Sequence, residues 1–177
     1  DNLWAGTYDR KMRNIFEVQT DVAKKIAYAL ESKLSPEEEA RIEQVPTQNL
    51  EAYTLYKQGK EKYYKYSGSG YEESVKFYKR SLNVDPLFSL AYAGLADSYA
   101  QLYLNFQDTT YRDLAFSAVE KSLKLDESLA EGYKALALIY QYDSNPNESL
   151  KYNLKAIKLK PGFSDAMGNV ALRYQSK

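Results

Sequence analysis

The side chains in this sequence that could support acid–base chemistry are carboxylates. They gather at Glu37, Glu38 and Glu39 and again at Glu72 and Glu73. Both groups fall in the first turns of predicted helices, where negative charge stabilises the positive end of the helix dipole. We therefore interpret them as structural rather than catalytic.

Other catalytic and metal-binding groups are missing from the composition. The 177 residues include no histidine and no cysteine, which excludes Ser-His-Asp triads, imidazole ligands, thiolate zinc sites and disulfides. The segment Ser67-Gly68-Ser69-Gly70 has neither a nucleophile elbow nor a P-loop lysine, so it is predicted to be a flexible turn. We predict that the chain is not an enzyme and binds no cofactor and no metal.

The overall charge and hydropathy argue against some classes of binding partner. Twenty-four Lys and Arg residues balance twenty-four Asp and Glu residues, which argues against binding to nucleic acid or to anionic lipid. No apolar run approaches 18 residues, so this segment is not expected to insert into a membrane. The absence of cysteine is compatible with the cytoplasm, which is slightly favoured, and with the periplasm.

A repeated helix-turn-helix unit organises most of the chain. Its best-kept copy, residues 130–163, reads as two amphipathic helices with a break at residues 143–146. The same residue types recur in the first helix of three successive units: Tyr92, Leu95, Ala96 and Tyr99; Tyr133, Leu136, Ala137 and Tyr140; Met167, Val170, Ala171 and Tyr174. Tyr133 and Met167 are one repeat period apart, whereas Tyr92 and Tyr133 are further apart. We place the seven extra residues in an over-long loop at 103–111.

This pattern resembles the tetratricopeptide repeat, a helix-turn-helix of about 34 residues. The resemblance implies an all-α, right-handed superhelical solenoid of antiparallel helix pairs. It places repeats at about 50–86, 87–127 and 128–161 and a final single helix at 162–176, within a domain spanning 49–177. Ala96 and Ala137 let paired helices approach closely. The first repeat departs from the pattern at Gln58 and Lys62, and the unpaired final helix favours continuation of the array beyond residue 177.

Residues 1–48 are predicted to form a separate N-terminal segment with one long and one short helix. Apolar residues at Ile15, Val18, Val22, Ile26 and Leu30 follow the helical period. Ser35, Pro36 and Glu38 then make a strong helix start for a short helix over 36–43. The stretch from Leu3 to Lys60 resembles the junction between a TolB-like domain and tetratricopeptide repeats in bacterial class III cyclases, winged-helix regulators and receptor kinases. It implies a fragment of a larger signalling protein.

The repeat resemblance also implies a concave groove lined by the first helices. Carried onto this chain, the groove positions that we assign to partner binding are Tyr53, Tyr56, Lys60, Tyr63, Tyr64, Asp97, Gln101, Glu131, Lys134, Leu138, Gln141 and Tyr142. Tyrosines with mixed charge between them suit an extended peptide or a partner helix. For each residue, simple packing against neighbouring helices is an equally weighted alternative. The family's clamp for C-terminal carboxylates is not expected, because Tyr56, Gly94, Glu131 and Ala135 replace most of its cationic and amide groups.

The leading hypothesis is a non-catalytic scaffold that binds a protein or peptide in this groove, within a bacterial multidomain signalling protein. Two alternatives stay open. One is an intramolecular or homo-oligomerisation arm that relays state to an effector domain. The other is a small-ligand sensor with its pocket between the N-terminal helix and the first repeat.

Overall fold

The computed structural model describes residues 15–30, 34–36, 39 and 45–175. Among these residues every regular element is a helix. The chain divides into two compact units, residues 1–45 and 46–177, and each unit is described by itself below. The predicted domain boundary between residues 48 and 49 stays a prediction.

In the first unit the structure describes one long helix, α1 (Ile15–Ala29). Its period-3.6 pattern agrees with the helix expected from residue 14. Val18 and Val22 are half-buried, whereas Tyr28 and Leu30 are largely exposed. Of the predicted short helix, Pro36 and Glu39 are helical, and the rest of it lies outside the described residues.

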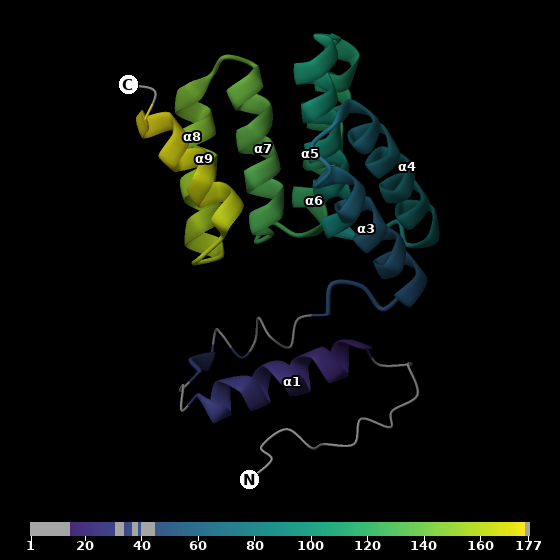
Figure 1. The fold of residues 1–177 in the computed structure, drawn as a ribbon, viewed down its shortest axis with the longest axis vertical. Coiled ribbons are helices and arrows are strands. Elements are labelled where there is room, and N and C mark those ends of the chain that lie inside the picture. The colour runs from purple at the N-terminus through teal and green to yellow at the C-terminus, as the bar shows by residue number, and fades with distance from the viewer. Residues whose placement is uncertain (1–14, 31–33, 37–38, 40–44, 176–177) are drawn as a thin grey trace. The chain divides into compact units, whose positions relative to one another are not determined.

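The second unit is a stack of helix pairs, which confirms the predicted all-α solenoid (Figure 1). Each pair packs internally and then against the pair that follows it. The helices are α3 (Leu50–Tyr63) and α4 (Gly68–Val84), α5 (Ser89–Phe106) and α6 (Thr109–Leu125), α7 (Ala130–Tyr142) and α8 (Pro146–Leu159), and the final α9 (Ser164–Gln175). Within the described residues, no helix is long and apolar enough to cross a membrane.

Side-chain caps set where several of these helices begin. Asn49 accepts a hydrogen bond from the backbone N–H of Ala52 at 3.0 Å, and Asp108 accepts one from Thr110 at 2.8 Å. Asn145 caps α8 in the same way, with Pro146 in the first turn. These side chains satisfy backbone N–H groups that have no partner inside the helix.

The core between the first and second repeats is centred on Tyr78 of α4, which is almost fully buried. Its ring lies against two helical glycines, Gly59 of α3 and Gly94 of α5. A Cβ atom at Gly59 would lie 2.7 Å from the ring, and one at Gly94 would lie 2.6 Å from it. Both positions therefore need glycine in order to accommodate one large aromatic side chain.

The predicted over-long loop at 103–111 is wrong. Helix α5 continues to Phe106, and α6 begins at Thr109, so the connection is Gln107 and Asp108 alone. Helices α5 and α6 are five and three residues longer than α7 and α8, while their turn is one residue shorter, which accounts for the seven extra residues. Gln107, at φ 55°, ends α5 in the left-handed conformation, and Asp108 immediately caps α6.

The predicted flexible turn at Ser67-Gly68-Ser69-Gly70 is also wrong. Ser67 is the N-cap of α4, and the three residues after it form the first turn of that helix. The Ser67 hydroxyl accepts a hydrogen bond from Gly70 N–H at 3.1 Å. A side chain at Gly70 would collide with the backbone oxygen of Lys62 at 2.8 Å, so the glycine allows close packing of α4 on the end of α3.

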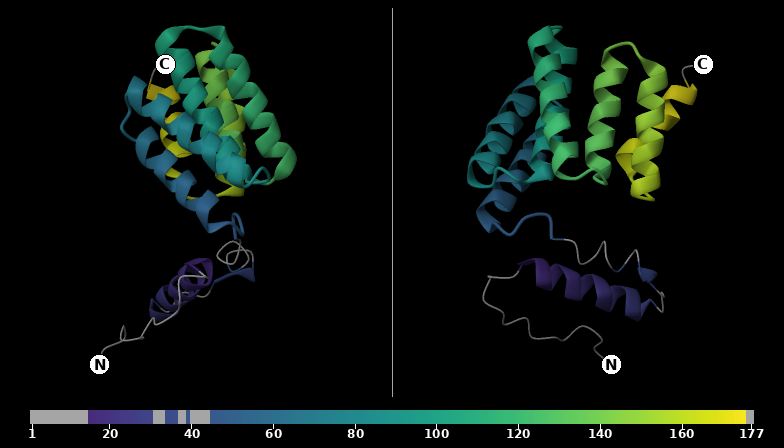
Figure 2. Two further views of the ribbon diagram at one scale, coloured as in Figure 1. Left: turned by 90° about the vertical axis from the view of Figure 1, so that its right-hand side faces the viewer. Right: turned by 180° about the vertical axis from the view of Figure 1, so that it is seen from behind.

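The last helix sits differently from its counterparts. Helix α7 packs on both α5 and α6, whereas α9 packs chiefly on α8. In the right-hand view of Figure 2, α9 lies alongside α8 at the C-terminal end of the stack. Met167, Leu172 and Tyr174 of α9 are exposed.

Candidate functional site

The first helices of the stack converge on a small hollow of about 80 Å³, which we call the groove hollow. Seven of the twelve predicted groove residues line it: Tyr56, Lys60, Tyr63, Tyr64, Asp97, Glu131 and Lys134. They come from α3, its C-terminal residue Tyr64, α5 and α7. Repeat geometry therefore brings together side chains from three successive repeats that are far apart in the sequence.

An ion pair joins two of these helices beside the hollow. The Lys134 ammonium group of α7 donates to Asp97 Oδ2 of α5, and both residues are buried. Burial raises the pKa of Asp97 above its usual range, and Lys134 opposes this shift. Burial also disfavours the charge on Lys134, but Asp97 outweighs it and raises the lysine pKa. Because both charges are buried, each depends on the other for compensation.

The rim of the hollow links the first repeat to the end of the stack. The Tyr64 hydroxyl donates to Asp165 Oδ2 of α9 at 3.3 Å. Lys160 forms an ion pair with Glu131 at 2.7 Å. Lys60 lies over the Tyr64 ring, 5.6 Å from its centroid, and burial lowers the pKa of its ammonium group. Tyr64 is 42% exposed, so it is the predicted groove tyrosine that solvent reaches most readily.

The other five predicted residues lie outside the groove hollow. Gln101 donates to the Tyr63 hydroxyl at 3.3 Å and accepts from the Tyr142 hydroxyl at 3.2 Å, so these three residues form a polar chain across the repeats. Tyr53 and Leu138 pack on the main core cluster. Gln141 lines a different cavity, between α7, α8 and α9.

Repeat positions alone did not identify several residues of the hollow. Tyr78 enters it from a second helix, α4, while Lys160 and Phe163 come from the turn before α9. Gly94 and Asp165 are also among the missed residues. The groove positions of the repeat contain no signal for Lys160 and Phe163, because these residues lie in the turn before α9, which only the curvature of the stack brings close to α3.

The charges that line the hollow balance one another. It holds three lysines and three carboxylates, so its formal charge is zero. Burial raises the pKa values of Tyr56, Tyr63 and Tyr78 above the usual tyrosine range, which keeps these hydroxyls protonated. Across the described ranges there is no group of three or more Asp or Glu residues arranged to hold a metal ion.

The fold is that of tetratricopeptide repeat domains. The first such domain of Spaghetti (RPAP3), solved with the HSP90 peptide SRMEEVD, is 16% identical to this chain with a TM-score of 0.55, over 75% of this chain and 98% of that one. The first domain of human RPAP3 is 18% identical with a TM-score of 0.56, over 71% and 91%. At these identities the likeness establishes the fold alone.

Among curated proteins, the chain is similar to putative adenylate cyclase 3 of Rhizobium meliloti (strain 1021). The two are 30% identical over 140 residues, which is 77% of this chain and 24% of the cyclase. The chain thus spans about a quarter of that relative's length. No family model matches the chain.

Proposed function

We propose that this chain is a non-catalytic interaction scaffold that binds an extended peptide or protein segment along its groove, as part of a bacterial multidomain signalling protein. The observation that carries the proposal is the meeting of tyrosines and paired charges from α3, α5, α7 and α9 in one hollow. Such a surface offers aromatic contact area together with hydrogen-bond donors and acceptors.

The comparisons support the proposal from two directions. One solved relative in fold is described with a bound HSP90 peptide, which favours a peptide as the occupant of the groove here. The similarity to a putative adenylate cyclase favours a place in a larger signalling protein. This similarity is also compatible with the resemblance of residues 3–60 to the junction between a TolB-like domain and tetratricopeptide repeats.

An array of immobilised peptides, probed with the full chain, tests the proposal. The variant to compare is Lys60→Ala combined with Tyr64→Ala, because these two residues lie at the accessible rim. Tyr56 and Lys134 are unsuitable, since both are buried and their replacement would disturb the stack itself. We expect the double variant to lose at least about tenfold in affinity for peptides that the parent chain selects, which corresponds to about 1.4 kcal/mol.

The matched control is Tyr174→Ala combined with Lys79→Ala. Both residues are exposed and lie outside the groove hollow, so their removal should leave binding unchanged. Peptides that bind the rim variant as tightly as the parent chain would refute the groove assignment. If the parent chain binds no peptide on the array, the proposed function as a whole is refuted.

The alternative function is a homo-oligomerisation arm, and one observation favours it. Helix α9 exposes Met167 and Tyr174, which lie seven residues apart on one face of the helix. Exposed apolar side chains of this kind can mediate association. Sedimentation of the chain over a range of concentrations separates the two functions. A concentration-dependent dimer that Met167→Glu abolishes would favour the arm.

A further inference from the structure

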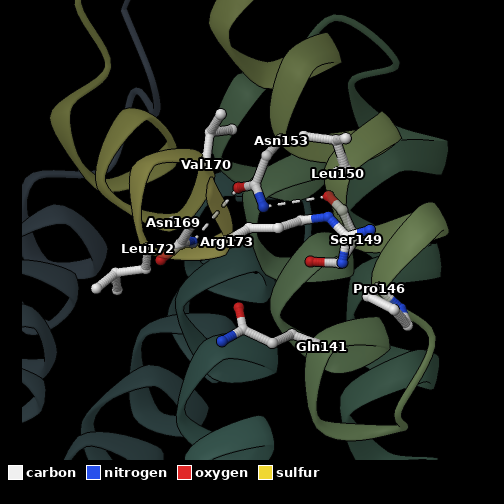
Figure 3. Close-up of a pocket in the computed structure, with 9 residues that line it drawn as sticks. All are labelled: Gln141, Pro146, Ser149, Leu150, Asn153, Asn169, Val170, Leu172 and Arg173. Atoms are coloured by element: carbon white, nitrogen blue, oxygen red, sulfur yellow. Dashed lines mark hydrogen bonds between the residues drawn. The ribbon is translucent and has the colours of Figure 1, made fainter. Parts of the chain in front are cut away.

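A second cavity, of about 310 Å³, lies between α7, α8 and α9. Five polar side chains line it: Gln141, Ser149, Asn153, Asn169 and Arg173. Figure 3 shows them arranged around the space between α8 and α9, with Gln141 approaching from α7. A volume of this size lies at the lower end of the range typical of small-ligand sites, about 300–1,000 Å³.

The preceding interface, between α5, α6 and α7, provides an internal comparison. Its equivalent positions lie one repeat earlier in the sequence than the five polar residues. Those positions hold Ala100, Ala115, Val119, Ala135 and Ile139, each no more than 1% exposed. Five apolar core residues in one interface are thus replaced by five polar residues in the next. The replacement forfeits apolar burial, which folding alone does not favour.

The polar residues are not those of a terminal cap. Capping repeats of solenoids carry polar residues on their outer face. Helix α9 shows the opposite arrangement, because Met167 and Tyr174 are 49% and 62% exposed while Asn169 and Arg173 line the cavity. The polarity is therefore directed into the cavity rather than toward solvent.

Internal hydrogen bonds hold part of the polar lining in place. Asn153, which is almost fully buried, donates to the backbone oxygen of Ser149 at 3.1 Å and accepts from Asn169 at 3.4 Å. The Arg173 side chain extends from α9 across to α8 (Figure 3), where it donates to Asn147 Oδ1 at 3.2 Å. The Ser149 hydroxyl and the Gln141 amide make no hydrogen bond to the described residues.

The charge of the lining favours an anion. Among its residues Arg173 alone carries a formal charge, and Pro146 places the positive N-terminal end of α8 at the same cavity. A guanidinium group can bind a carboxylate through two parallel hydrogen bonds. Leu150 and Val170 add apolar wall beside these polar groups.

We propose that this cavity binds a small organic carboxylate with a short hydrocarbon body. Its carboxylate accepts hydrogen bonds from Arg173, with Ser149 and Gln141 as further donors, and its hydrocarbon part lies against Leu150 and Val170. This site is separate from the groove hollow, and its occupancy does not depend on the proposed peptide binding.

Thermal unfolding of the full chain tests the proposal, with succinate, glutarate and benzoate as probes and glutaramide as the uncharged counterpart of glutarate. We expect at least one carboxylate to raise Tm saturably, by about 2–4 °C at several times its Kd, while glutaramide leaves Tm unchanged. The proposal is overturned if none of the three acids raises Tm, or if glutaramide raises it as much as glutarate does.

Two variants and one control sharpen the test. Arg173→Gln should lose the ligand-induced shift, whereas Arg80→Gln, at an exposed arginine of α4, should keep it. The triple variant Asn153→Val, Asn169→Ala and Arg173→Ile copies the core of the α6–α7 interface. It should raise Tm without ligand and abolish the response to carboxylates. A shift that persists in both variants would refute the site.

Discussion

Lys134 of α7 and Asp97 of α5 form an ion pair in which the two residues are only 6% and 8% exposed. The pair joins the second and third repeats beside the groove hollow. The other carboxylate oxygen, Asp97 Oδ1, has no hydrogen-bond partner among the described residues. The pair therefore carries an electrostatic cost that a purely apolar contact would avoid.

Removing one partner should destabilise the chain more than removing both. Lys134→Met leaves a buried carboxylate without its counter-charge, and we expect a loss of about 3–5 kcal/mol in the free energy of unfolding. The double variant Lys134→Met with Asp97→Leu replaces the pair by apolar groups of similar volume and should unfold close to the parent chain. Urea unfolding followed by circular dichroism measures both. Equal losses in the single and double variants would contradict this account.

The glycines around Tyr78 provide a second prediction. Gly59→Ala and Gly94→Ala each place a Cβ atom within 2.7 Å of the Tyr78 ring, and we expect each to cost about 1–3 kcal/mol through overpacking. Gly168 of α9 is the control, since a Cβ atom there meets nothing within 4 Å. Gly168→Ala should stabilise the helix by up to about 1 kcal/mol. Thermal unfolding of the three variants should therefore shift Tm in opposite directions.

The sequence predicted the helix pairs well but misplaced the extra length of the second repeat. The spacing between Tyr92 and Tyr133 counts residues and does not say whether they are helical. Residues 103–106 continue α5, and Asp108 caps α6 at once. Asp108 is a residue type that commonly caps the start of a helix, and this local signal predicts a helix that begins at residue 109. Giving that signal priority over the repeat spacing would have placed the boundary correctly.

The groove was predictable to the extent that repeat positions fix the direction of side chains. They placed seven residues in one hollow but did not show that Lys134 and Asp97 are buried as a pair. Such a pairing depends on the offset between neighbouring repeats, which a helical period leaves undetermined. The contribution of Lys160 and Phe163 depends on the curvature of the whole stack, for the same reason.

The ion pair between Arg112 and Asp143 predicts a loss of stability in acid. Arg112 Nε and Nη2 donate to the two Asp143 oxygens at 2.7 and 2.8 Å, and these hydrogen bonds lower the pKa of Asp143. A lowered pKa means that the stabilisation is complete above the usual Asp pKa of about 3.9 and is lost as pH falls through the folded-state value. Because both side chains are partly exposed, the contribution should be about 1 kcal/mol or less.

Asp143→Asn tests this prediction. The variant should be less stable than the parent chain at neutral pH, and the difference should shrink as the pH is lowered below about 4. Chemical unfolding at several pH values measures the difference directly. Asp113, which is exposed and contacts the same arginine at 3.3 Å, is the control, and Asp113→Asn should change stability far less. A constant difference across the pH range would indicate that the Asp143 pair is not the titrating contact.

The final prediction concerns the repeat position that holds a small residue, alanine, in both α7 and α9. This position is buried in α7 and exposed in α9. Ala137 of α7 is fully buried, and Ala137→Leu should overpack the interface at a cost of about 1–3 kcal/mol. Ala171 occupies the same repeat position in α9 but is exposed, so Ala171→Leu should change the free energy of unfolding by no more than about 0.5 kcal/mol. Urea unfolding of the two variants distinguishes burial from repeat position as the cause. Equal losses at both positions would show that α9 packs as tightly as α7 does.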